Sequence, residues 1–202
     1  MSPDVVLEVD QLLKFAVAAD FQPAVITYAM LLMNNPKSFD ELESLLRKSI
    51  EKYHNPEAYS ALGTHFINNK DKNDGMKLIE EAFKLGSHNA SYILGKIYSP
   101  FCDLDGGVKK DGKIALEYLK QNTMAQAVYE IAKLYYRGCD GVEQNMSNAL
   151  ILYDRVKKEL DYLPSLEEAT KLPPPKKNHT FIIFIISILI LILSLIAFRY
   201  YH

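Results

Sequence analysis

Histidine and cysteine are the residues of this chain whose chemistry could most readily serve catalysis or metal binding. They are His54, His65, His88, His179 and His202, and Cys102 and Cys139. No histidine has a carboxylate or cysteine at metal-ligand spacing, and the cysteines lack the CxxC spacing of zinc and redox sites. No serine or cysteine lies in a motif typical of a nucleophile. The sequence therefore predicts no catalytic residue, no metal and no cofactor, and we expect two reduced thiols in loops between helices.

One acidic, glycine-rich loop, Asp103-Leu104-Asp105-Gly106-Gly107, has part of the pattern of a calcium-binding loop. Counted from Asp103, however, the sixth position is Val108 instead of glycine. The twelfth position is Ile114 instead of the bidentate glutamate that such a loop needs. The loop also lacks the Lys-Ser or Lys-Thr that follows a phosphate-binding glycine loop. It is therefore expected to be part of the fold and not an ion site.

The charge balance gives no sign of a nucleic-acid surface. The chain has 23 basic and 25 acidic residues, and its formal net charge is −2. A nucleic-acid-binding domain or a polybasic lipid-binding patch would carry a clear excess of lysine and arginine. We expect no nucleic-acid partner and no small-molecule substrate.

A four-residue pattern recurs four times and organises most of the chain. Each copy begins with alanine, has a pair of residues at offsets 4 and 5, and has a large residue at offset 8. The copies are Ala24, Tyr28, Ala29 and Leu32; Ala58, Leu62, Gly63 and Phe66; Ala90, Leu94, Gly95 and Tyr98; and Ala127, Ile131, Ala132 and Tyr135. These offsets share one face of a helix. The small residue at offset 5 should let a neighbouring helix approach closely, and the large residue at offset 8 should fill the space beside it.

A second helix is expected after each copy, so that every unit is a pair of helices. Its apolar positions are Leu42, Leu45 and Leu46; Leu78, Ile79 and Ala82; Ala115, Tyr118 and Leu119; and Ala149, Leu152 and Tyr153. No stretch alternates with period two for long enough to form a strand. The predicted fold is all-α, a helix-turn-helix repeat solenoid of about four units.

Local signals indicate where the helices begin and end. The run Ser38-Phe39-Asp40-Glu41 is typical of a capping box, and Asn55-Pro56 of an N-cap followed by proline at the first helical position. Gly86 and Gly138 stand where helices are expected to end. We expect the solenoid over 22–160, after an N-terminal capping helix in 1–21 and before a short capping helix and a Pro/Lys linker in 161–180.

Two of the units resemble Sel-one-like (Sel1-like) repeats, which are short relatives of tetratricopeptide repeats. The first is Ala90-x3-Leu94-Gly95-x2-Tyr98, followed by Gly107-Val108-Lys109-Lys110-Asp111 and Ala115; the next is Gly138-x2-Gly141-Val142 with Ala149. The glycine-valine loop distinguishes this class from plain tetratricopeptide repeats, to which the two earlier units are closer. The resemblance covers about residues 22–160 and implies a scaffold whose stacked helices bind peptide segments or partner subunits.

The resemblance also implies a candidate partner-binding groove, because the first helix of each pair lines the concave face in such repeats. The corresponding positions are Tyr92 and Lys96 in one unit and Tyr129 and Lys133 in the next, with Tyr136 close by. Two stacked tyrosines beside two lysines would form a basic, aromatic stripe. Such a stripe suits an extended peptide that carries carboxylates. The alternative is that these are ordinary solvated residues on a helix surface.

The C-terminal segment Phe181 to Phe198 has the composition of a transmembrane helix. Its 18 residues include no charge, and at roughly 1.5 Å per residue they span about 27 Å, close to the thickness of a bilayer core. Only the short tail 199–202 follows, so the arrangement resembles that of tail-anchored, single-pass membrane proteins. Lysines precede the segment and Arg199 alone follows it, which predicts that the N-terminal domain faces the cytosol.

The target membrane is left open by the sequence. A short anchor suits a thin membrane, and its high content of isoleucine and leucine favours the endoplasmic reticulum. Its shortness and the terminal Arg199 are also typical of the mitochondrial outer membrane, which is the alternative.

These features predict a tail-anchored adaptor or scaffold that binds a protein partner at the cytosolic face of an organelle. Assembly or quality control of a membrane complex is one process that would need such an adaptor. Two alternatives stay open, a permanent structural subunit of a larger membrane complex and, less favoured by the residues present, an enzyme.

Overall fold

The computed structural model describes residues 3–160 and 162–171, with side chains from residue 8 onward. This part of the chain forms one compact unit that ends at Lys171. The predicted linker, transmembrane helix 181–198 and tail 199–202 lie outside the described residues. Within the described residues, no helix is both long and apolar enough to cross a membrane.

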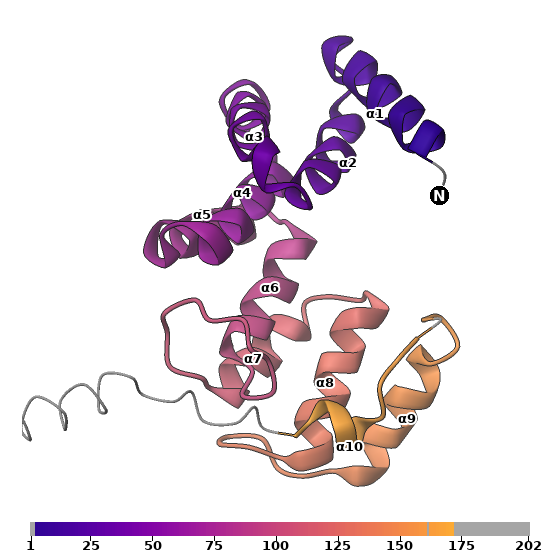
Figure 1. Ribbon diagram of the computed structural model, residues 1–202. Coiled ribbons are helices and arrows are strands. Elements are labelled where there is room, and N and C mark those ends of the chain that lie inside the picture. The colour runs from indigo at the N-terminus through magenta and orange to yellow at the C-terminus, as the bar shows by residue number, and fades with distance from the viewer. Residues whose placement is uncertain (1–2, 161, 172–202) are drawn as a thin grey trace, which may run out of the picture. The chain divides into compact units, whose positions relative to one another are not determined.

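The described chain is all-helical, as the sequence predicts (Figure 1). Its α-helices are α1 (Pro3–Ala18), α2 (Gln22–Met33), α3 (Phe39–Tyr53), α4 (Pro56–Asn69), α5 (Lys72–Lys84), α6 (His88–Tyr98), α7 (Gly112–Leu119), α8 (Ala125–Arg137), α9 (Met146–Val156) and α10 (Leu166–Ala169), with a 3-10 turn, η1 (Pro36–Ser38), between α2 and α3. Four antiparallel pairs follow one another as α2/α3, α4/α5, α6/α7 and α8/α9. The predicted helical-repeat solenoid is confirmed.

The residues of the repeated pattern form the contacts between helices. The alanines at offset 0 are at most 5% exposed in all four units. At offset 5 the space is so small that a Cβ atom on Gly95 would lie 2.6 Å from Leu119 Cδ2, and one on Gly63 would lie 2.8 Å from the carbonyl oxygen of Gly75. Both distances are well below van der Waals contact. The glycines therefore permit the close approach of the paired helices that the sequence predicts.

The two glycine-valine loops have the same local structure. Gly107 and Gly141 both have left-handed φ values, 78° and 76°, which place the following valines against the core. Asp111 and Asn145 then cap α7 and α9 with their side chains. The backbone N–H of each capping residue donates to a carbonyl of the preceding first helix, at 2.8 Å in both units. A glycine is needed at both left-handed positions because a side chain there would be strained.

One predicted cap is wrong, although its helix, α3, begins directly after Ser38 as the sequence predicts. Ser38 precedes α3, but its side chain accepts no hydrogen bond from the first turn of the helix. Its hydroxyl instead accepts a hydrogen bond from Asn35 Nδ2, and the predicted partner Glu41 accepts the hydroxyl of Tyr28 at 2.6 Å. The 3-10 turn η1 runs directly into α3, so Ser38 does not have the extended backbone of an N-cap. The Asn55 cap and the glycine ends at Gly86 and Gly138 are confirmed.

Polar contacts also join neighbouring units. Asn89 Nδ2 donates to Glu57 Oε2, 32 residues earlier, and Asn122 Nδ2 donates to the carbonyl of His88, 34 residues earlier, both at 2.6 Å. Both bonds join the start of one unit to the start of the unit before it, so they help to fix the register in which one unit stacks on the next.

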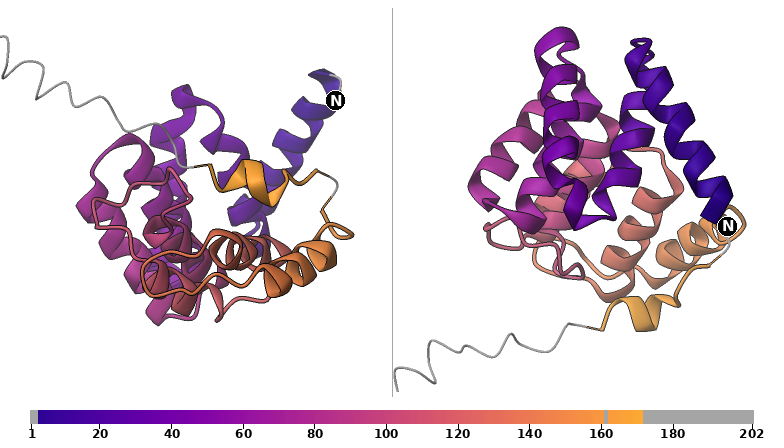
Figure 2. Two further views of the ribbon diagram at one scale, coloured as in Figure 1. Left: turned by 90° about the horizontal axis from the view of Figure 1, so that it is seen from below. Right: turned by 45° about the horizontal axis from the view of Figure 1, so that its top comes forward.

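The first helices of the units form the inner row of the stack. Each packs on the next, α2 on α4, α4 on α6 and α6 on α8, whereas the second helices have no comparable packing on one another in the described part of the chain. Helix α10 continues the inner row by packing on α8 (Figures 1 and 2). It lies where the first helix of a fifth unit would pack, and Arg137 Nε donates to Thr170 Oγ1, 33 residues later. This helix matches the predicted short C-terminal cap.

A candidate protein-binding groove

A hollow of about 640 Å³ lies between the later first helices and the loop that follows α6. We call it the inter-repeat groove. Its walls come from the end of α4, the start of α5, α6, α8 and the loop after α6. The residues that line it are Ile67, Asn68, Lys72, Lys96, Phe101, Cys102, Asp103, Leu104, Asp105, Glu130 and Lys133. It is an open groove with mixed polar and apolar walls, which suits a chain segment better than an enclosed small molecule.

The structure brings the two predicted lysines together but not the tyrosines. Lys96 and Lys133, from consecutive first helices, both line the inter-repeat groove. Each ammonium lies over the ring of the tyrosine four residues earlier, at 5.3 Å for Tyr92 and 5.4 Å for Tyr129. Neither these tyrosines nor Tyr136 line the groove. The lysine positions are therefore organised by cation–π contacts within each helix.

The tyrosines of α8 face the C-terminal cap. Tyr129 is 8% exposed, its hydroxyl donates to the carbonyl of Pro164 at 2.9 Å, and its nearest aromatic partner is Tyr153 at 6.2 Å between ring centroids. Tyr136 packs in the same apolar cluster as Leu166 of α10. The predicted tyrosine stack between units is absent among the ring contacts of the described residues. Segment 163–170 covers α8 where the stack would have extended.

Burial strengthens the preference of these phenols for the neutral form. It raises the pKa of Tyr92 to about 12, with smaller effects from the carboxylate of Glu130 and from Cys102. It likewise raises the pKa of Tyr129 to about 12, with smaller effects from Glu130, Tyr153 and Glu168. Both side chains therefore stay neutral at physiological pH, so the ammonium groups of Lys96 and Lys133 lie over neutral rings.

A buried ion pair forms one wall of the inter-repeat groove. Lys133 Nζ lies 2.6 Å from Glu130 Oε2, and both side chains are 7% exposed. The contact is an ion pair, and the buried Glu130 Oε2 accepts no hydrogen bond within the described residues. Lys133 Nζ also lies 3.5 Å from the carbonyl of Phe101, at the outer limit of a hydrogen bond. Because the two charges largely compensate each other, Lys133 has little capacity left to bind an external anion.

Lys96 is the cation of the groove that has no counterion in the described part of the chain. Lys72 is paired with Asp105 at 2.6 Å and Lys133 with Glu130, whereas Lys96 lies over the face of Tyr92 and forms no ion pair within the described residues. An ammonium held over an aromatic ring, half-buried in a groove, keeps its hydrogen-bond donors available. The arrangement can therefore accept a carboxylate or a backbone carbonyl from another chain.

The loop wall of the groove is built around a lysine. Lys110 Nζ donates to three backbone carbonyls, those of Ile97, Cys102 and Leu104, at 2.8, 2.9 and 2.7 Å. The loop 103–107, which has part of a calcium-loop pattern, is thus held in place by the ammonium group of Lys110. Lys72 also reaches this loop through its pair with Asp105. These contacts fix the position of Phe101 and Leu104 in the groove wall.

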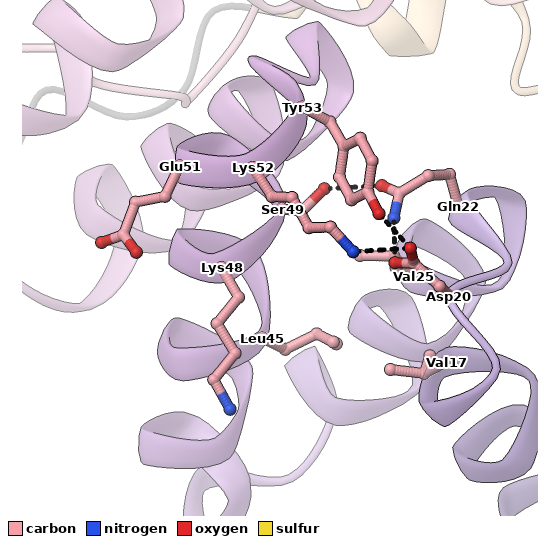
Figure 3. A pocket seen from close by; sticks show the side chains of 10 residues that line it. All are labelled: Val17, Asp20, Gln22, Val25, Leu45, Lys48, Ser49, Glu51, Lys52 and Tyr53. Carbon is pink, nitrogen blue, oxygen red and sulfur yellow. Dashed lines mark hydrogen bonds and ion pairs between the residues drawn. The ribbon is translucent and has the colours of Figure 1, made fainter.

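A second hollow, of about 450 Å³, lies between α3 and the corner that joins α1 to α2 (Figure 3). Its polar groups at the α1–α2 corner bond to one another, whereas Lys48 and Glu51 on α3 form no ion pair within the described residues. Lys52 Nζ lies 2.6 Å from Asp20 Oδ2, the hydroxyl of Tyr53 donates to the same carboxylate, and Ser49 donates to Gln22. Lys52 and Tyr53 hold the pKa of Asp20 below its usual value. The bonds of Asp20 therefore hold the α1–α2 corner against α3 at this hollow.

Sequence reasoning missed several residues that shape the inter-repeat groove. Glu130 lies three residues before Lys133 on the same helix, and this spacing predicts an ion pair. Nothing in the sequence indicated that Lys110 and Phe101 shape the groove, because their roles depend on how the loop after α6 folds back over α6 and α8.

Comparisons with known proteins concern the fold. One solved structure similar to this chain is a crystal structure of a Sel1 repeat protein from Oxalobacter formigenes, with a TM-score of 0.56 and 22% sequence identity. The similarity covers 74% of this chain and 62% of that one, so this chain spans less than two thirds of the length of that protein. No family model and no curated protein matches the sequence. The described part of this chain has the fold of a Sel1-like helical repeat.

Proposed function

We propose that this protein is an adaptor that binds an extended segment of a partner protein in the inter-repeat groove. The observation that carries the proposal is Lys96, the cation of the groove without a counterion among the described residues. Helical repeats of this fold commonly expose such inner surfaces to peptide segments. The analogy of fold supports binding in general, and the charges of the groove supply the chemistry of the ligand.

The partner segment should present a carboxylate to Lys96. A charge-assisted hydrogen bond from the ammonium is about twice as strong as a neutral one, and the apolar walls at Ile67, Phe101 and Leu104 would exclude water around it. The same segment can place N–H groups toward Asp103, which forms no ion pair in the described residues. An acidic side chain within an extended, partly apolar peptide fits these requirements.

The adaptor is further proposed to work at a membrane. The sequence of 181–198 supports a single-pass anchor with the repeat domain on the cytosolic side, at the endoplasmic reticulum or alternatively at the mitochondrial outer membrane. The Pro/Lys linker would then hold the groove away from the bilayer surface, where a cytosolic segment can reach it.

Charge reversal at Lys96 tests the groove. Capture of partner proteins by the tagged full chain in mild detergent should be compared for wild type, Lys96→Glu and the matched control Lys113→Glu. Lys113 is exposed on the second helix α7 and lies outside the groove lining. Proteins held by the groove should be lost, by about tenfold or more, from Lys96→Glu and kept by Lys113→Glu. Equal recovery with a well-folded Lys96→Glu protein would place the binding surface elsewhere.

Lys133 is less suitable for this test, although the sequence predicts it to line the groove in the same way as Lys96. Glutamate at position 133 would bury two carboxylates side by side, since Glu130 is 2.6 Å from the present ammonium group. Loss of partner capture would then be indistinguishable from loss of the fold.

A further inference from the structure

The buried ion pair in the wall of the inter-repeat groove has hydrogen-bonding groups that the fold leaves unused. Glu130 and Lys133 compensate each other in charge, and both side chains are 7% exposed. The described residues donate no hydrogen bond to the Glu130 carboxylate. Lys133 Nζ carries three N–H groups, and its hydrogen bond to the carbonyl of Phe101 is 3.5 Å long, at the outer limit. The pair therefore has both an acceptor and a donor to offer in the groove.

The position of the pair gives these unused groups access to a ligand. Native proteins leave few buried polar groups without hydrogen bonds. A buried ion pair is also often no more stabilising than apolar residues of the same volume, so stability alone does not account for this one. Both Glu130 and Lys133 line the inter-repeat groove. A ligand that enters the groove would complete their hydrogen bonding.

Lys96 lies close to the same pair. Its ammonium is 5.3 Å from the centre of the Tyr92 ring, and the carboxylate of Glu130 is near enough to that ring to help raise the pKa of the phenol. Helix α6, which carries Lys96, packs on α8, which carries the pair. One bound segment can therefore contact the ammonium of Lys96 and the Glu130–Lys133 pair at the same time.

The charges of the pair determine which ligand group suits it. A cationic group would add a second positive charge beside Lys133, and an anionic group would add a second negative charge beside Glu130, so both are disfavoured. A carboxamide is neutral and has two N–H donors and a carbonyl acceptor. Its N–H can donate to Glu130 while its oxygen accepts from Lys133. The hydroxyl of serine or threonine is carried on a shorter side chain, so it fits a recessed pair less well.

We propose that the inter-repeat groove prefers a partner segment with a glutamine or asparagine side chain near its acidic residue, and that the Glu130–Lys133 pair binds this carboxamide. The inference rests on the proposed function, since Lys96 binds the acidic residue of the same segment. The acidic residue supplies charge attraction, and the carboxamide supplies specificity. An apolar side chain in its place would cover the pair and leave its acceptor without a donor.

Selection from a peptide library tests this proposal. The full chain in mild detergent is offered octapeptides that have a fixed central glutamate and randomised flanking positions. Wild type should enrich glutamine or asparagine at a flanking position. Replacement of that residue in the peptide by methionine, which has a similar size and no N–H donor, should weaken binding by about tenfold.

A double variant removes the pair from the protein. Glu130→Leu with Lys133→Met leaves no lone buried charge, so it should fold, which thermal unfolding would verify. It should still require glutamate in the peptide but lose the preference for a carboxamide. The matched control is Glu81→Leu with Lys84→Met, which removes an exposed ion pair of the same spacing on α5, outside the groove lining. The control should select the same peptides as wild type.

Failure of this inference and failure of the proposed function give different results. Glutamate-dependent binding without a preference for a carboxamide would overturn the inference alone, and so would a preference that persists in the folded double variant. If the double variant does not fold, the methionine peptide decides the question on the wild-type protein. Absence of glutamate-dependent binding, or binding that Lys96→Glu does not weaken, would overturn the proposed function and this inference with it.

Discussion

Glycine at position 95 lets helices α6 and α7 pack closely, because it has no Cβ atom. Gly95→Ala should lower the free energy of unfolding by about 1–3 kcal/mol, because the new methyl group meets Leu119, which is fully buried and has no room to move. Alanine otherwise favours a helix over glycine by about 1 kcal/mol, so a net loss identifies the clash. Thermal unfolding of residues 1–171 measures it, with Glu117→Ala on the exposed side of α7 as the control. An unchanged or higher midpoint for Gly95→Ala would contradict the packing described for α6 and α7.

Glu43 is expected to make the stability of the fold depend on pH in the acid range. Burial alone would raise its pKa, but hydrogen bonds from Lys70 and His65 together lower it below the ordinary value of 4.5. The ionised form is therefore favoured in the folded state. Its contribution to stability is complete above pH 4.5 and is lost as the pH falls through the lowered pKa.

Glu43→Gln tests this expectation. The variant should be less stable than wild type near pH 7, by about 1–3 kcal/mol, because buried His65 loses a charged partner at 3.2 Å. The difference between the two proteins, measured by urea unfolding, should shrink as the pH is lowered from 4.5. A difference that is constant from pH 7 to pH 3 would show that the carboxylate contributes nothing through its charge.

The lysines of the groove could be predicted from the sequence, and the positions of the tyrosines could not. The helical register placed Lys96 and Lys133 at equivalent positions of consecutive units, and both do line one groove. The same register placed Tyr92 and Tyr129 together, yet Tyr129 bonds Pro164. Register along a helix follows from local periodicity, whereas the docking of segment 163–170 on α8 is a tertiary contact that periodicity does not encode.

At the scale of elements, the loop after α6 is the part of the groove most dependent on one side chain. Lys110→Met should remove three hydrogen bonds to backbone carbonyls and destabilise the loop by at least about 2 kcal/mol. The amides of residues 101–108 should then exchange hydrogen faster, and partner capture should fall together with loop order. Lys109→Met, the exposed neighbour, is the control and should leave both unchanged. Equal exchange in the two variants would mean that the ammonium group does not hold the loop.

Element types and most ends of the helices were predictable because their causes are local. The Asn55-Pro56 start and the glycine ends depend on backbone conformation within a few residues. Ser38 fails as a cap because it belongs to the 3-10 turn η1, whose backbone is already helical, and because its hydroxyl is bonded to Asn35. A residue of the right type thus fails to cap where the preceding backbone is not extended.

For the whole molecule, location should be determined by the C-terminal segment alone. Residues 170–202 fused to a fluorescent protein should reach the same membrane as the full chain, and a chain that ends at Leu172 should be cytosolic. A truncated chain that resists alkaline extraction from membranes would contradict this expectation.

The central claim is that the inter-repeat groove holds a protein segment against Lys96. The most direct measurement is photo-crosslinking in cells from a photoreactive phenylalanine analogue placed at Phe101, which lines the groove. The control position is Phe83, on the second helix α5 and outside the lining. We predict a discrete crosslinked partner from position 101 that is absent from position 83 and disappears when Lys96→Glu is combined with the probe. A crosslink from position 101 that is unaffected by Lys96→Glu, or the same partner from both positions, would contradict the account.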